Sequence, residues 1–510
     1  MKSKKTPYDQ LFELSKTIKT LASIELLLDW DQETYMPSAA IDFRAEQKAL
    51  MAGHVHKLLT STKFSHLLNQ LIDLESGQIV DSSLSPAPLS PDKCAALREW
   101  RRDHLRSIKL PEPFVKTFTS TCAIAGNIWI EAKKTSNFAH FAPHLTKLFQ
   151  LCRKKADLIG YQDHPYDALL DLYEPGMTVA KLSPLFDRLK TALTSLVKTI
   201  KAQPPIDTDC LKGEFNSELQ MQFGRKILKA MGFTPANARL DIAVHPFCTS
   251  LHPLDTRMTT RTHHDDLMSN VYSVIHEGGH GLYNQGLNLE QFGSPLGEQS
   301  SLGIDESQSR WWETRIGRTK AFWTHFLPIL KKDFPQLKAS LDQFYLAINQ
   351  VRPSFIRVEA DEVTYSLHVI LRFELEKALL EGSLKVKDIP AVWNQKMHDY
   401  LGITPSNDAE GCLQDVHWGF GLIGYFPTYI LGNLYAAQFF HAFEKAHSDW
   451  QSRVSQGELG FIREWLRTNI HQYGRQYTPE ELVQRISGKP LNESDYVHYL
   501  NAKYKEIYRF

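Results

Sequence analysis

The sequence predicts a mainly α-helical fold with a small β-sheet next to one of its helices. Apolar residues recur at three- and four-residue steps through most of the chain, for example in residues 11–28 and 182–197. This spacing is the period of an amphipathic helix. Residues 239–247 instead alternate polar and apolar side chains, and a second β-prone segment follows at 255–261. We therefore expect two short strands there, which could pair as a hairpin.

The composition is that of a globular protein with ample core-forming material. Of 510 residues, 42% are hydrophobic and 23% are charged. The 58 Lys and Arg residues balance the 58 Asp and Glu residues, so no global field favours nucleic acid or a membrane surface. The six cysteines form no CxxC pair, which argues against a disulfide framework and a thiolate zinc site. Without a signal peptide or a run of about 18 apolar residues, a cytoplasmic protein is expected.

Residues 1–510 are expected to form a single unit. Length alone favours about three domains, but the sequence contains no Gly/Ser linker, repeat or low-complexity tract. The Pro-rich segment 84–91 is interpreted as a surface connection between helices. We expect residues 1–238 to be a largely helical half and residues 239–510 to carry a metal and substrate site.

The segment HEGGH, residues 276–280, is the strongest chemical signal. On a helix, His276 and His280 lie on one face and can bind the same ion, while Glu277 can reach a water bound to that ion. Glu277 is therefore the candidate general base of a zinc hydrolase. The alternative is a helix with two ordinary surface histidines, because so short a motif also arises by chance.

The flanking residues favour a helix over 267–286. Apolar residues recur at helical spacing before and after the motif, and Gly286 is a natural stop. Gly278 and Gly279 are unfavourable within a helix, by about 1 kcal/mol each relative to Ala. We infer that close packing or substrate excludes side chains at these two positions.

A third ligand is predicted on a second helix, in the segment 304–313. Glu306 lies 26 residues beyond His280, and two histidines with one glutamate leave a coordination position open for water. Asp305 and Glu313 are rival carboxylates, and Glu306 could instead be a solvent-facing acid.

Nine segments of the chain, taken together and in order, resemble the Taq-type metallocarboxypeptidase family. These segments are LLDWDQETYMP at 27–37, YDALLDLYEPGMT at 166–178, HPF at 245–247, DTRMT at 255–259, HEGGH at 276–280, ESQS at 306–309, IRVEADE at 356–362, GCLQDVHW at 411–418 and GYFPTY at 424–429.

The resemblance implies a helical fold with a deep cleft, removal of single residues from peptide C-termini, and homodimers. It also implies a divalent metal, usually zinc, with Co²⁺ as another possible ion. Carried over by position, His276, His280 and Glu306 are the ligands and Glu277 is the base. One departure concerns the residue before the ligand Glu306, which is usually His in the family and is Asp305 here.

His417 and Tyr425 are the candidates for donors that stabilise the tetrahedral intermediate. Both lie in segments that resemble the family, QDVHW and GYFPTY. Loss of one such donor typically costs about 3 kcal/mol of transition-state stabilisation. The alternative for each is plain aromatic packing.

An enzyme acting at the C-terminus must bind a free carboxylate, and an Arg guanidinium does so with two parallel hydrogen bonds. Arg357 is the first candidate and Arg257 the second. Each could instead be the structural partner of a nearby acid, such as Asp361 or Asp255.

His245 is also expected at the substrate site. Like Asp415, it could support the metal ligands from behind, or it could be an ordinary polar residue of the core.

The function predicted from these residues is a metallocarboxypeptidase acting on peptides with broad specificity. The strands at 239–261 could hold an extended peptide through backbone hydrogen bonds, regardless of its side chains. Two alternatives remain open: a zinc endopeptidase or oligopeptidase with the same ligands, and a catalytically weak metal-binding scaffold.

Overall fold

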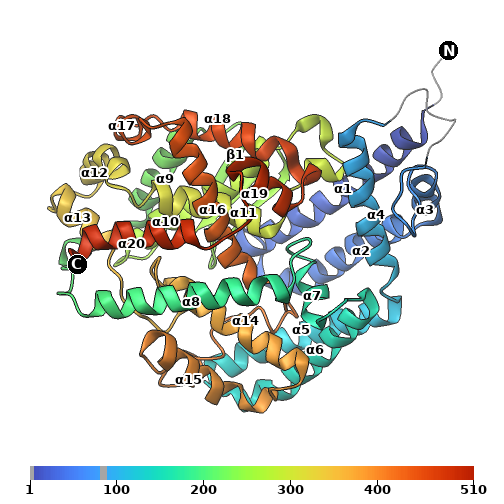
Figure 1. Ribbon diagram of the computed structural model, residues 1–510, viewed down its shortest axis with the longest axis horizontal. Coiled ribbons are helices and arrows are strands. Elements are labelled where there is room, and N and C mark those ends of the chain that lie inside the picture. The colour runs from blue at the N-terminus through green and yellow to red at the C-terminus, as the bar shows by residue number, and fades with distance from the viewer. Residues whose placement is uncertain (1–4, 81–88) are drawn as a thin grey trace.

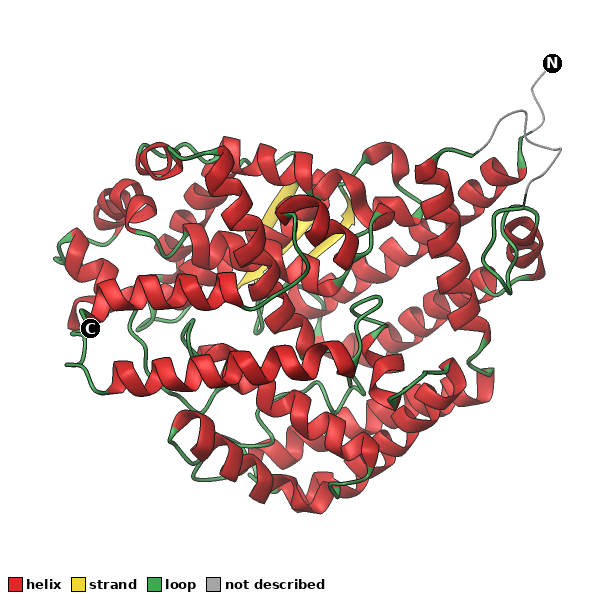
Figure 2. Cartoon of the chain, viewed as in Figure 1, coloured by secondary structure: helices red, strands yellow, loops and turns green. Residues whose placement is uncertain are grey.

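The structure is a computed structural model that describes residues 5–80 and 89–510. Helices account for 67% of it, and its strands form a three-stranded sheet within the described residues. Figure 2 shows the sheet as a small element surrounded by helices. The predicted mainly α-helical fold with a small sheet is therefore confirmed. Most of the predicted connection at 84–91 lies outside the described residues.

The first half of the chain is helical. Its helices are α1 (Pro7–Thr34), α2 (Ile41–Leu59), α3 (Thr62–Asn69), α4 (Pro91–Ile108), α5 (Glu112–Lys134), α6 (Phe138–Ile159), α7 (Pro165–Leu170), α8 (Val179–Lys201) and α9 (Ser217–Met231). In Figure 1, α1 to α4 occupy one end of the molecule. The residues expected to form helices at 11–28 and 182–197 lie in α1 and α8.

The second half begins with the sheet and continues with helices. Its main helices are α10 (Leu267–Gly286), α11 (Leu302–Arg310), α12 (Lys320–Asp333), α13 (Leu341–Ile348), α14 (Tyr365–Glu381), α15 (Ile389–Leu401), α16 (Pro427–Ala446), α17 (Trp450–Ser455), α18 (Gly460–Asn469), α19 (Pro479–Ser487) and α20 (Ser494–Tyr508). A π-helical turn, Trp311–Ile316, continues α11. None of these described helices has the length and apolar character needed to cross a bilayer.

The sheet contains β1 (Ala238–Ile242), β2 (Cys248–His252) and β3 (Asp255–Thr260), in the order β1-β3-β2. The two strands expected from the sequence, β1 and β3, pair in parallel and so do not form a hairpin. The hairpin is instead formed by β2 and β3, which pair antiparallel. The predicted first strand ends early because residues 243–247 leave the sheet, and Pro246 among them has no N–H to donate to a ladder.

The alternation of side chains from β1 onward also predicts the wrong buried face, because the apolar side chains are exposed and a polar one is buried. Ile242 and Val244 are 52% and 77% exposed, whereas Asp241 is buried. Asp241 accepts hydrogen bonds from Arg239 and from the hydroxyl of Tyr35, so its burial is compensated. Polar contacts of Asp241 with Tyr35, which follows α1, and with Arg239 therefore stand where an apolar contact was expected.

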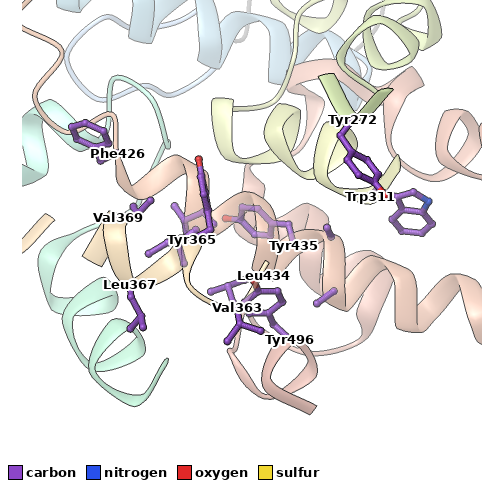
Figure 3. Close-up of a cluster of buried hydrophobic side chains, with 14 of the residues drawn as sticks. Tyr272, Trp311, Val363, Tyr365, Leu367, Val369, Phe426, Leu434, Tyr435 and Tyr496 are labelled. Atoms are coloured by element: carbon purple, nitrogen blue, oxygen red, sulfur yellow. The ribbon is translucent and has the colours of Figure 1, made fainter. Parts of the chain in front are cut away.

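Most helices pack around one large hydrophobic core that extends from Ala125 to Tyr508. A smaller cluster joins α1, α3 and α4 to Leu296. Figure 3 shows a region of buried side chains that come from distant parts of the chain, including Tyr272 of α10, Tyr365 of α14 and Tyr496 of α20. The helices that carry the predicted site are thus held by long-range packing.

Candidate metal centre and active site

The three predicted metal ligands lie close together. His276 and His280 project from α10, and Glu306 projects from α11. Each residue offers one ligand atom, and these atoms all lie within 4.8 Å of one another. Glu306 Oε2 is 3.5 Å from the Nε2 atom of each histidine. Two imidazoles and one carboxylate in this arrangement fit a divalent metal with an open coordination position.

The two rival carboxylates lie behind the histidines and not at the ligand cluster. Glu313 Oε2 pairs with Nδ1 of His276 at 2.9 Å, and Asp305 Oδ2 lies 3.0 Å from Nδ1 of His280. Carboxylates in this position orient an imidazole and increase its basicity toward a metal. Asp305 thus supplies an anion beside a candidate ligand histidine.

Glu313 is itself held by two cations. Arg310 Nη1 donates to it at 2.7 Å, and Arg318 Nη2 lies 3.6 Å from it. Burial alone would raise the pKa of Glu313, but Arg310 and His276 keep that pKa well below its usual range. The carboxylate behind His276 is therefore ionised across the physiological range.

The ligand residues form a network of opposite charges. Burial opposes the charging of His276, but Glu306 and Glu313 outweigh it and raise the pKa of that imidazole. Glu306 is likewise buried, and the neighbouring histidines nevertheless lower its pKa. For Glu277, burial dominates and raises the pKa of the carboxyl group.

Close backbone packing sets the distance between α10 and α11. A Cβ atom at Gly279 would lie 2.5 Å from the backbone of Gln308 and Ser309. One at Gly432 of α16 would lie 2.4 Å from Cγ of Glu306. A Cβ atom at Gly278 would meet the side chain of Met231 at 2.8 Å. Packing thus accounts for the two glycines of HEGGH, as one of the two sequence interpretations proposed.

Helix α11 is also fixed at its N-terminus. Glu174, from the YEPGMT segment, accepts a hydrogen bond from the backbone N–H of Gly303 at 3.0 Å and another from Tyr435 at 2.7 Å. Ser301 caps the same helix by accepting from the N–H of Ile304. Glu174 was not among the residues predicted from the sequence. Glu174 is distant from α11 in the sequence, so its role at the N-terminus of that helix becomes visible only in the folded structure.

Arg357, the first candidate for the substrate carboxylate, is 4% exposed. Its Nε and Nη2 atoms donate to Asp415 at 3.1 and 2.9 Å, and its Nη1 atom donates to Tyr365. Its acidic partner is therefore Asp415, and not Asp361. Asp361 accepts hydrogen bonds from its own loop, including the N–H groups of residues 352, 363 and 364.

A second buried arginine, Arg372 of α14, was not predicted. Its Nε atom donates to the other oxygen of Asp415 at 2.6 Å, so Arg357 and Arg372 share one carboxylate. Two guanidinium groups with one acid leave an excess of positive charge. The available signal was an Arg within the apolar run HVILRFEL, because buried Arg requires a partner.

His417 and Tyr425 lie close to each other, with ring centroids 5.4 Å apart. His417 is paired with the hydroxyl of Tyr429 at 3.1 Å, and burial lowers its pKa to about 3, so the ring is neutral. Burial raises the pKa of Tyr425 to about 12, and the carboxylates of Glu306 and Asp305 add to this effect. Tyr425 is thus a protonated hydroxyl in the electric field of the ligand cluster.

Arg257 and His245 are not brought to the ligand cluster. Arg257 pairs with Asp255, its sequence alternative, and lies 4.4 Å above the ring of Trp30. It alternates along β3 with Thr256, which faces α10 near Gly281, so it points away from that helix. His245 is exposed to solvent.

A helix carrying two histidine ligands and a neighbouring acid, with a third ligand from the next helix, defines a metallopeptidase of the HExxH class. A family model, carboxypeptidase Taq (M32) metallopeptidase, matches residues 10–504. The chain belongs to this family.

Named relatives agree with the assignment over nearly the whole chain. Thermostable carboxypeptidase 1 of Thermus thermophilus is 38% identical over 98% of this chain and 99% of its own. Carboxypeptidase 1 of Bacillus subtilis is 38% identical, covering 98% of both chains. The crystal structure of the M32 carboxypeptidase from Deinococcus radiodurans R1 has a TM-score of 0.94 at 35% identity, with 99% of this chain and 100% of that chain covered. These similarities support a metallocarboxypeptidase function and a divalent metal at the His-His-Glu cluster.

Proposed function

We propose that this protein removes single residues from the C-termini of peptides, with zinc at His276, His280 and Glu306. The observation that carries the proposal is the buried pair Arg357 and Arg372 on one carboxylate, Asp415. Its surplus positive charge can bind the C-terminal carboxylate of a substrate, which an internal peptide bond lacks.

The neighbouring residues connect this charge to the metal centre. Arg357 donates to Tyr365, and the guanidinium of Arg310 lies 5.2 Å from the Tyr365 ring. Arg310 in turn binds Glu313, which pairs with His276. A terminal residue between Arg357 and the ligand cluster would present its peptide bond to Glu277.

Bound zinc would polarise the scissile carbonyl and lower the pKa of a coordinated water from 15.7 to about 7. Glu277, with a pKa raised by burial, accepts a proton from the attacking water and transfers it to the departing amine. Tyr425, protonated and near Glu306, is the proposed donor to the developing oxyanion. We propose that the neutral His417, which lies next to Tyr425, positions Tyr429 through a hydrogen bond with its hydroxyl.

We propose that β2 holds the substrate backbone. β2 is an edge strand of the sheet and lies beside α10. An extended peptide can add to such an edge through hydrogen bonds that do not depend on its side chains, which supports broad specificity.

The test uses pairs of N-blocked dipeptides that differ only at the C-terminus. A free carboxylate should permit cleavage, and amidation of the same peptide should stop it. Cleavage of amidated peptides at internal bonds would establish the endopeptidase alternative instead. Bound zinc without hydrolysis of any peptide would establish the scaffold alternative, so metal content is measured on the same samples.

Three further properties belong to the proposal. The protein is expected to act as a homodimer in the cytoplasm and to need no nucleic acid or membrane. Light scattering of the purified protein and localisation of a tagged copy test these points.

A further inference from the structure

A polar cavity of about 150 Å³ lies at the end of β2 and has no part in the chemistry above. Its walls come from α1, β2, the last turns of α10 and the loop before α11, and its lining includes Lys19, His252, Asn284 and Glu298. It has room for one side chain or a few waters.

The cavity continues the face of α10 that carries the metal ligands. Asn284 follows His280 by four residues and His276 by eight, so all three lie on one side of the helix. Its side chain donates to the carbonyl of His280 at 2.9 Å. Asn284, which lines the cavity, therefore lies about 6 Å further along the helix axis than His280.

Strand β2 leads along the same path. At its start, the thiol of Cys248 lies in the field of Glu277 and Asp305, and at its end His252 lines the cavity. Residues of a strand advance by about 3.3 Å each. Consider an extended peptide that lies beside β2 with its scissile bond at the metal. The residue that reaches the cavity would be the third or fourth one on the N-terminal side of that bond.

The direction of the peptide follows from the position of Arg357. Glu359, two residues after Arg357, binds Arg261, which also contacts Ser269 in the first turn of α10. The proposed carboxylate site is thus at the N-terminal end of α10, and the cavity is at the C-terminal end. A peptide anchored by its C-terminus at Arg357 must extend toward the cavity.

The groups that line the cavity favour a ligand side chain that accepts hydrogen bonds. Both oxygens of Glu298 are occupied, one by Lys19 at 3.0 Å and the other by Arg475 at 3.2 Å. Lys19 has three N–H donors, and among the described residues only Glu298 is recorded as its partner. His252 accepts from the N–H of Leu254 at Nδ1, so its Nε2 carries a proton in the neutral ring.

We infer that this cavity is a substrate subsite that selects peptides with an acidic or amide side chain at the third or fourth position before the scissile bond. The inference rests on the proposed carboxypeptidase function. Donors from Lys19 and His252 would bind such a side chain, whereas a Lys or Arg side chain would meet the ammonium group of Lys19.

The experiment compares N-blocked pentapeptides that end in the same two residues and carry Glu, Gln, Ala or Lys at each earlier position in turn. At the third or fourth position before the scissile bond, kcat/KM should be about three- to tenfold higher for Glu than for Lys, which is the range of a partly exposed ion pair. Lys19→Met should abolish this preference, Lys19→Glu should reverse it, and the surface control Lys57→Met should leave it unchanged. Equal rates for Glu and Lys at every position would overturn the inference.

A blocked dipeptide, too short to reach the cavity, separates this subsite from the proposed function. Its cleavage should be the same in the wild type and the Lys19 variants, which also shows that they fold. The dissociation constants of the pentapeptides are measured as well on Glu277→Gln, which should bind them without turnover. If the dipeptide is not cleaved, the proposed function fails. The subsite is then still tested by whether the pentapeptides with Glu bind more tightly than those with Lys.

Discussion

Replacing Asp305 with Asn keeps the shape of the side chain and removes the charge beside Nδ1 of His280. The two side chains are only 15% and 17% exposed, and the contact is 3.0 Å, so solvent screens the pair weakly. Changes of this kind behind a metal-bound histidine typically cost 10- to 100-fold in metal affinity, or about 1.4 to 2.8 kcal/mol. We expect zinc affinity to fall by about tenfold to thirtyfold, within that range.

The assay is competition for zinc against a chromophoric chelator, together with the rate at which the chelator removes zinc. Asp305→His, which installs the residue that the family resemblance led us to expect, should also weaken binding, because it removes the anion. Glu313→Gln is a less selective comparison, since it would leave Arg310 and Arg318 without their buried partner. Unchanged zinc affinity and release rate in Asp305→Asn would refute the reasoning that this carboxylate supports His280.

Three further predictions test other parts of the site. Glu277→Gln should retain zinc and lower kcat by about 10² to 10⁴, the usual contribution of a general acid–base group; metal analysis and turnover of the same sample check this, and full activity would exclude the role. Gly279→Ala places a methyl group 2.5 Å from the backbone of α11, so it should destabilise the fold by about 1 to 3 kcal/mol and loosen zinc; an unchanged melting temperature would contradict the packing argument. Burial raises the pKa of Glu376 to about 7, so the folded state binds its proton more tightly than the unfolded state. The stability gained from this proton is complete below about pH 4.5 and is lost as the pH rises through about 7. Melting temperatures from pH 4.5 to 8 should therefore fall less steeply in Glu376→Gln than in the wild type, and parallel curves would exclude this effect.

The parts of the site predicted best are those with local geometry. The spacing of His276 and His280 fixes their common face once a helix is assumed, and the apolar stripe and Gly286 give that helix correct bounds. Glu306 was identified as the third ligand through spacing and family resemblance, and the structure places it beside both histidines.

The parts that could not be predicted depend on how distant segments pack. The pairing of β1 with β3 requires a sheet order that no local alternation encodes. Asp305 and Glu313 remained rivals of Glu306, because their roles depend on the angle between α10 and α11. Arg372 became visible only when α14 was placed against Asp415.

The close packing of α11 between α10 and α16 has a consequence for motion at the metal centre. At Gly279, α10 meets the backbone of α11, so this separation does not depend on a side chain that can change rotamer, while Gly432 of α16 packs against the side chain of Glu306. Opening the stack would require the helices to move apart as whole units, in a rare sub-global event. Backbone amides of α11 should therefore be among the slowest in the chain to exchange with deuterium, even though they lie next to a site that must admit water and peptide.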